Sequence, residues 1–285
     1  MPFVSRWSSR TVRVLTALLL TVRSAAAQTS PAQASTAKIV SAASAFLATL
    51  DEKQRSGMLF AFDDEKQRVR WSNFPTGFVP RSGVRFADMN PSQRAAAMSL
   101  LATALSKRGL EKVQQIVDAD EVLRVSERNN PMFGKENDKA FALMGSLDEG
   151  QRSQAILGYR VSDLVLGPGK DGKTIQPEGL RASAMNDAQR SMLFDLITEW
   201  TGIVHESAAK ERLAELKAGL NDTWFAWSGP TTAVSGRNGT AYYRIQGPKV
   251  VIEYAPQSMG GDPSMHIHSM YRDPTNDYGR KPAAK

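Results

Sequence analysis

Two histidines near the C-terminus have the spacing of a partial metal site. His266 and His268 stand two residues apart in a stretch that we expect to be a β-strand. Alternate side chains of a strand share a face, so both imidazoles stand together while Ile267 and Tyr271 face the other way. Two neutral imidazole nitrogens supply half of a zinc or copper site. The remaining donors would be carboxylates, and the candidates are Asp262, Asp273, Asp277 and Glu253.

The same histidines also fit a simpler interpretation. A lone His-x-His is a weak motif, and spacing alone favours two polar residues that hydrogen-bond the Asp-rich loop at 273–279. That loop does not have the ligand spacing of an EF-hand, and its Asp, Asn, Pro and Gly residues are typical of turns. Both interpretations of the histidines stay open. No Ser/His/Asp arrangement is evident, so catalytic residues stay unassigned.

A second group of residues is suited to an organic ligand. Arg272 presents a planar guanidinium that clamps a carboxylate or phosphate, although pairing with Asp273 or Glu253 is commoner. Aromatic side chains of the same region either form a stacking platform for a sugar or pack as core and cross-strand pairs. Those that we single out are Trp224, Trp227 and Tyr242.

These residues require a sheet to position them. Thr240–Gln246 and Lys249–Tyr254 alternate in polarity and flank Gly247–Pro248, which suits a type II′ hairpin turn. That turn pairs Gln246 with Lys249 and gathers apolar side chains on one face, as a half-buried sheet requires. The earlier part of the chain has helical spacing instead, with a break expected at Gly109 and an extended piece at Val161–Leu166. The sequence therefore predicts an α+β fold, with helices first and an antiparallel sheet at the C-terminus.

One helix-start phrase occurs four times and predicts how the helices are arranged. Each copy has Asp or Asn at the N-cap, Gln three residues later and an apolar residue just before. The caps are Asp51, Asn90, Asp148 and Asn186. Because the second cap follows the first by 39 residues and the fourth follows the third by 38, we expect a duplicated pair of elements. The halves lie near 42–130 and 139–220, before a sheet over 221–280, in one domain covering 37–280.

The N-terminus predicts export. Residues 1–27 combine arginines, the apolar run Val14–Val22 and an Ala-rich junction, which is the pattern of a signal peptide cleaved near Ala27. Residues 28–36 are expected to form a flexible tether. Those first 27 residues hold four arginines and no acid, so the mature chain carries +3 rather than the +7 of the full sequence. So small a charge does not favour nucleic acid as a partner. The mature chain has no apolar run long enough to span a membrane, and it has no cysteine.

Several stretches resemble an exported family catalogued as domain of unknown function 3500. The likeness spans roughly residues 42–280. The stretches that carry it are Phe74–Pro80, Gly83–Arg94, Asp163–Gly169, Gln176–Leu180, Thr223–Pro230, Gln257–Gly261, His266, His268 and Tyr271–Gly279. The resemblance implies a secreted or periplasmic protein and no established activity. It also implies a mid-chain β segment with a Gly-His-His motif, whereas here Asn137 is followed directly by Asp138.

Two hypotheses on function follow. We favour a non-catalytic exported binding or scaffold domain, because the chain holds only three histidines and lacks the mid-chain motif. The alternative is a metal-dependent enzyme or metal-binding protein that uses His266 and His268 to hold zinc or copper. The sequence assigns neither a small-molecule nor a protein partner.

Overall fold

The computed structural model describes residues 31–74, 77–125, 134–233, 238–257, 262–264 and 266–279, with the backbone alone at 119–125. The predicted signal peptide lies outside these residues. The helices are α1 (Pro31–Ala48), α2 (Glu52–Ser56), α3 (Glu65–Arg68), α4 (Pro91–Ala104), α5 (Lys107–Val125), α6 (Gly134–Ser146), α7 (Glu149–Ala155), α8 (Asp187–Thr201) and α9 (Glu206–Ala218). Short 3-10 turns are η1 (Phe86–Asp88), η2 (Ala182–Ala184), η3 (Leu220–Asp222) and η4 (Asp277–Gly279). The strands are β1 (Leu180–Arg181), β2 (Trp224–Ser228), β3 (Tyr242–Gly247), β4 (Val250–Pro256) and β5 (Ile267–Arg272).

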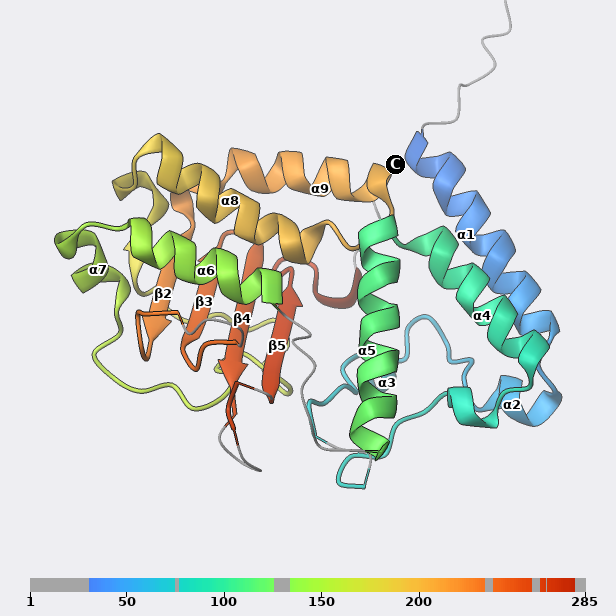
Figure 1. Cartoon of the computed structure of the whole chain (residues 1–285). Coiled ribbons are helices and arrows are strands. Elements are labelled where there is room, and N and C mark those ends of the chain that lie inside the picture. The colour runs from blue at the N-terminus through green and yellow to red at the C-terminus, as the bar shows by residue number, and fades with distance from the viewer. Residues whose placement is uncertain are drawn as a thin grey trace, which may run out of the picture.

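The predicted α+β class is confirmed. The strands form one antiparallel sheet in the order β1-β2-β3-β4-β5, and helices precede it along the chain. Figure 1 shows α6 and α8 lying across one face of the sheet, with α5 standing between the sheet and the α1–α4 pair. No helix in the described part of the chain has the length and apolarity needed to cross a membrane.

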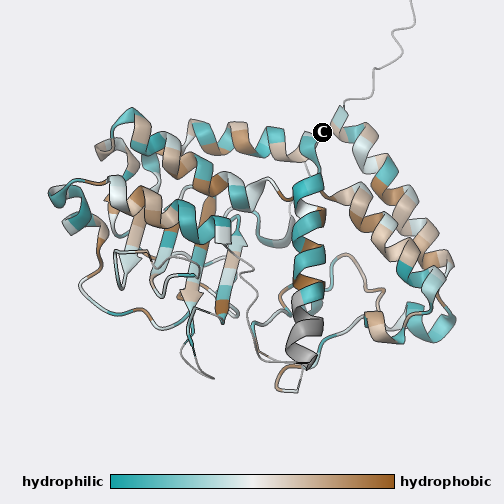
Figure 2. Cartoon of the chain, in the orientation of Figure 1, coloured by the Kyte–Doolittle hydropathy of each residue, from teal (hydrophilic) through white to brown (hydrophobic). Residues whose placement is uncertain are grey.

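The main core lies between the sheet and its helices. Phe225, Trp227 and Tyr243 point from the strands into a cluster with Leu143 of α6 and Leu196 of α8, all of them fully buried. Trp227 meets Phe141 edge to face at 4.9 Å between ring centroids. Figure 2 shows apolar residues along these strands and helices. Burial of this apolar surface drives the packing of helices on sheet.

The hairpin register differs from the predicted one by two residues. Gly247 pairs with Val250, and Ile245 pairs with Ile252 rather than with Val250. An even shift keeps each side chain on its face, so the predicted apolar face is correct. Any residue with a side chain would clash at position 247, because a Cβ there would lie 2.5 Å from Thr223 Oγ1. The constraint on this glycine is packing against β2, which the turn chemistry of the hairpin does not reveal.

The expectation that only one face of the sheet is buried is wrong. On the second face Tyr242, Arg244, Gln246 and Glu253 are all buried. The coil between α7 and β1, residues 157–179, covers them, and its Leu166 packs with Val251 and Met270 of the sheet. We expected an extended piece at 161–166, but these residues lie in coil and join no strand.

Helix boundaries depart from expectation at two places. Helix α1 begins at Pro31, inside the stretch expected as a tether, and its buried Ser35 lies 2.8 Å from Ser207, oxygen to oxygen. We expected a break at Gly109, but the chain turns at Leu105–Ser106 and Gly109 lies within α5. A Cβ at Gly109 would lie 2.0 Å from the Ile203 carbonyl oxygen. This glycine therefore permits close contact between the two halves.

All four predicted N-caps are confirmed. Asp51, Asn90, Asp148 and Asn186 each accept a hydrogen bond from the backbone of the glutamine three residues on, and each glutamine side chain accepts one from the cap amide. These are complete capping boxes, which satisfy amides that the first turn of a helix leaves free.

The capping glutamines also join the helix starts in pairs. In the second half Gln189 Nε2 donates to Gln151 Oε1 at 2.8 Å and to the Ser146 carbonyl at 2.8 Å. In the first half Gln93 Nε2 donates to Gln54 Oε1 at 2.8 Å and to the Thr49 carbonyl at 2.9 Å. The starts of α2 and α4 in the first half, and of α7 and α8 in the second, thus share one set of locking contacts.

Removing a buried capping glutamine tests this lock. Gln189→Ala should lower the free energy of unfolding by about 1–3 kcal/mol, because buried backbone groups lose their partners. Gln154→Ala, at an exposed position of α7, is the matched control and should change it by no more than about 0.5 kcal/mol. Urea titration measures both. An unchanged midpoint for Gln189→Ala would contradict the lock, as would equal losses in the two variants.

Candidate ligand site

The coil at 157–179 is fixed to the sheet by one buried carboxylate. Glu253 is fully buried on β4. It accepts hydrogen bonds from the backbone amides of Val165 at 2.9 Å and Leu166 at 2.7 Å, and from the Tyr242 hydroxyl. A buried carboxylate is costly unless donors surround it, and here the donors come mainly from the coil. The proposed metal donor Glu253 therefore serves to hold the coil.

Arg244 extends this network across the same face. Its side chain is fully buried, with Nη1 3.2 Å from the Tyr242 hydroxyl and Nη2 2.6 Å from Glu178 Oε2. Burial, reinforced by Glu253, raises the pKa of Tyr242 well above its usual range. Burial also acts to raise the pKa of Glu178, but hydrogen bonds from Tyr159 and Arg244 outweigh it and lower that pKa. Tyr242 is thus a neutral donor and Glu178 an ionised partner at neutral pH.

Arg272 is also used within the chain. Its guanidinium forms a buried pair with Asp277, with 2.5 Å between Nη2 and Oδ2, and donates to the carbonyl oxygens of Leu166 and Lys173. We expected Asp273 or Glu253 as the commoner partner, but the structure places Asp277 there. Four contacts leave Arg272 little capacity for a ligand.

The two C-terminal histidines do stand together. The rings of His266 and His268 lie 4.9 Å apart between centroids, nearly perpendicular. His268 Nδ1 is 2.8 Å from Asp163 Oδ1 and 2.8 Å from Asn73 Nδ2. A protonated Nδ1 suits the carboxylate of Asp163, whereas a bare Nδ1 suits the NH2 group of Asn73, so these two contacts do not select one tautomer.

The carboxylates proposed to complete a metal site are elsewhere. Asp273 lies 3.1 Å from Arg212 Nη2 and caps the turn at Thr275, and Asp262 accepts from the Ser264 amide. Asp277 and Glu253 are engaged as described above. Within the described ranges, no group of three or more His, Cys, Asp or Glu side chains is arranged to hold a metal ion. The structure thus brings the two imidazoles together with Asp163, a residue outside the proposed set.

The three candidate aromatics do not form a platform. Trp227 points into the helix-covered core, whereas Trp224 and Tyr242 lie on the opposite face of the sheet. Trp227 and Tyr242 are fully buried. Trp224 is half-buried, and the Arg181 guanidinium lies 6.0 Å from its ring centroid. The core alternative for these aromatics thus describes Trp227 and Tyr242.

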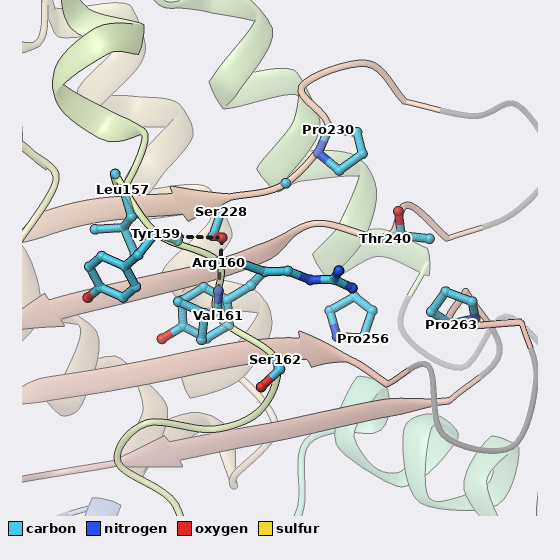
Figure 3. Close-up of a pocket in the computed structure, with 13 residues that line it drawn as sticks. Leu157, Tyr159, Arg160, Val161, Ser162, Ser228, Pro230, Thr240, Pro256 and Pro263 are labelled. Atoms are coloured by element: carbon cyan, nitrogen blue, oxygen red, sulfur yellow. Dashed lines mark hydrogen bonds between the residues drawn. The ribbon is translucent and has the colours of Figure 1, made fainter.

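A cavity of about 600 Å³ opens where the coil passes the ends of β2, β3 and β4. Ser228 of β2 holds its coil wall: its hydroxyl accepts from the Val161 amide and donates to the Tyr159 carbonyl, both at 3.1 Å. Figure 3 shows the Arg160 side chain reaching from the coil toward Pro256, on the side where Thr240 lies. Ser162 lines the cavity, whereas its chain neighbour Asp163 contacts His268 and is not a lining residue.

Sequence reasoning missed Arg160, which lines the cavity, and also Asn73, Asp163 and Glu178, which contact His268 or Arg244. Asp163 and His268 are 105 residues apart, and Asn73 is farther still. Arg160 and Glu178 lie in a coil with no catalytic or metal motif. The one available signal was the family-like stretch Asp163–Gly169, which a plain surface loop would not have explained.

Comparison with known proteins adds a family but no relative of known activity. A family model described as "Protein of unknown function (DUF3500)" matches residues 32–129 and 124–280. No curated protein matches the chain, and neither does any solved structure.

Proposed function

This chain belongs to the family described as "Protein of unknown function (DUF3500)", whose description names no activity, and we propose from the geometry that it is an exported, non-catalytic binding domain. The observation that carries the proposal is the cavity of about 600 Å³ beside β2, β3 and β4. Small-molecule sites are commonly clefts of about 300–1,000 Å³ with a few polar groups among apolar ones. The volume of this cavity lies within that range, and both polar and apolar residues line it.

The state of the ionisable groups supports binding rather than catalysis. Arg244, Glu253 and Arg272 are buried and satisfied by partners within the chain, so they build the frame of the cavity. His268 has an orienting carboxylate in Asp163, as a general base does. In the part of the chain that the structure describes, however, no hydroxyl side chain is hydrogen-bonded to His268, and an activated nucleophile requires such a contact.

Export is supported by the N-terminal sequence alone. The arginines, the apolar run and the Ala-rich junction of residues 1–27 favour secretion with cleavage near Ala27. The absence of cysteine suits an oxidising compartment, since no thiol is exposed to unwanted pairing.

Filling the cavity tests the proposed function. Gly158 lines the cavity, and a Cβ at this position meets nothing within 4 Å, so Gly158→Trp should fold and occupy the space. A thermal-shift screen of small molecules should yield ligands that raise the melting temperature of the parent protein. Native mass spectrometry of the secreted protein would report carried-over ligand and a mature terminus at Gln28.

The matched control is Gly145→Trp, at an exposed position of α6 that is also open to a Cβ. Ligands found in the screen should stabilise this variant as they do the parent and fail to stabilise Gly158→Trp. If no compound stabilises the parent, or if every ligand stabilises Gly158→Trp equally, the cavity is not a ligand site.

The contact between His266 and His268 favours metal binding as a second candidate function. Two neighbouring imidazoles provide two soft nitrogen donors for zinc or copper, and Asp163 lies against one of them. We also propose, because Asn137 is followed directly by Asp138, that this chain lacks the family's Gly-His-His segment. With only His266 and His268 as imidazole donors, we expect metal binding to be weak.

Elemental analysis separates the two candidates. The purified parent protein should hold no stoichiometric zinc or copper, and a version with the mid-chain segment restored should bind metal more strongly. Tight stoichiometric metal in the present chain, lost from the folded double variant His266→Ala/His268→Ala, would reverse our preference.

A further inference from the structure

We propose that the cavity is selective for a small organic carboxylate, with Arg160 pairing with the carboxylate and proline rings holding an apolar body. This inference rests on the proposed binding function and names its ligand class. It depends on the charge, the unused donors and the walls of the cavity.

Arg160 is the one charged residue among the described residues that line the cavity. It is exposed, and its guanidinium makes no hydrogen bond or ion pair with the described part of the chain. Arg244 and Arg272, on the same side of the sheet, are paired with Glu178 and Asp277. Arg160 therefore keeps its charge and its donors for an added group.

The acids near the cavity have partners of their own, and Asp262, which precedes the lining residue Pro263, accepts from the Ser264 amide at 2.9 Å. Glu178 is paired with Arg244 and accepts from the Tyr159 hydroxyl at 2.7 Å. Glu253 is enclosed by its three donors, and Asp163 Oδ1 receives the Leu164 amide at 2.7 Å besides contacting His268. The cavity thus presents one positive charge to an added anion.

The walls indicate the rest of the ligand. Pro230, Pro256 and Pro263 line the cavity, and Figure 3 shows Arg160 among them with the Thr240 hydroxyl near the same opening. Proline rings have no N–H and present apolar surface. Thr240 and Ser162 are exposed and add hydroxyl donors. A molecule with one acidic group and one apolar ring matches this arrangement.

A single guanidinium favours a carboxylate over a phosphate. Arginine binds a carboxylate in a bidentate fork whose charges balance. Phosphate sites usually add a second cation or the free amides at a helix N-terminus. The cavity has neither among its described lining residues, which come from coil, strands and loops.

Isothermal titration with four probes tests the ligand class. We expect phenylacetate to bind about tenfold or more tightly than phenylacetamide, which has the same shape without the charge. Acetate should bind weakly because it has no apolar ring. Phenyl phosphate should bind no more tightly than phenylacetate. Arg160→Gln should bring phenylacetate to the affinity of the amide, whereas Arg160→Lys should keep part of the preference.

Arg70→Gln is the matched control, since Arg70 is an exposed arginine outside the cavity, and it should bind as the parent does. Equal affinity for phenylacetate and phenylacetamide overturns the inference, and so does a preference that survives Arg160→Gln. Tighter binding of phenyl phosphate assigns the site to phosphates instead. If none of the four probes binds, this ligand class is wrong, while ligands from the wider screen that Gly158→Trp excludes would still sustain the binding function.

Discussion

The buried carboxylate of Glu253 is a central contact among those that hold the coil at 157–179 against the sheet. A sheet with both faces buried must find partners for every polar group on its second face. Glu253 finds them in the amides of Val165 and Leu166, so the coil at 157–179 is bound to the sheet through its backbone. Once the coil is fixed, Arg272 can hold the Leu166 carbonyl, Asp163 can meet His268, and the wall that carries Arg160 is set in place. The cavity is thus a consequence of how the buried charges are satisfied.

The two halves of the helical part differ in where the coil between their helices lies. Both halves lock two helix starts with a pair of capping glutamines, yet only the second half places its intervening coil across the sheet. In the first half, among the described residues of 57–86, Trp71 packs against the cluster of Leu166, Val251 and Met270, and Asn73 contacts His268. Its Phe62 and Phe78 remain largely exposed. The same local framework therefore supports a covered polar face in one half and an open aromatic surface in the other.

The parts of the fold that local chemistry determines were predictable from sequence. The four N-caps follow from side chains three residues apart, and the apolar face of the hairpin follows from a period of two. The register was not predictable, because Gly247 is constrained by Thr223, the residue just before the neighbouring strand β2. The burial of Tyr242, Arg244 and Glu253 was missed for the same reason: it depends on a coil some 65 to 95 residues away in sequence. The site residues most distant in sequence, Asn73, Asp163 and His268, carry no shared motif.

Hydrogen exchange in Glu253→Gln tests the central role of this carboxylate most directly. A glutamine amide has one acceptor oxygen, and its NH2 group would face backbone donors, so both coil amides cannot be satisfied. We predict that exchange at Val165 and Leu166 becomes about tenfold faster or more, while Leu193 and Leu196 in α8 keep their protection. Unchanged exchange at Val165 and Leu166 would contradict the account, and so would an equal loss of protection in α8, because the carboxylate would then support the whole fold rather than the coil that shapes the cavity.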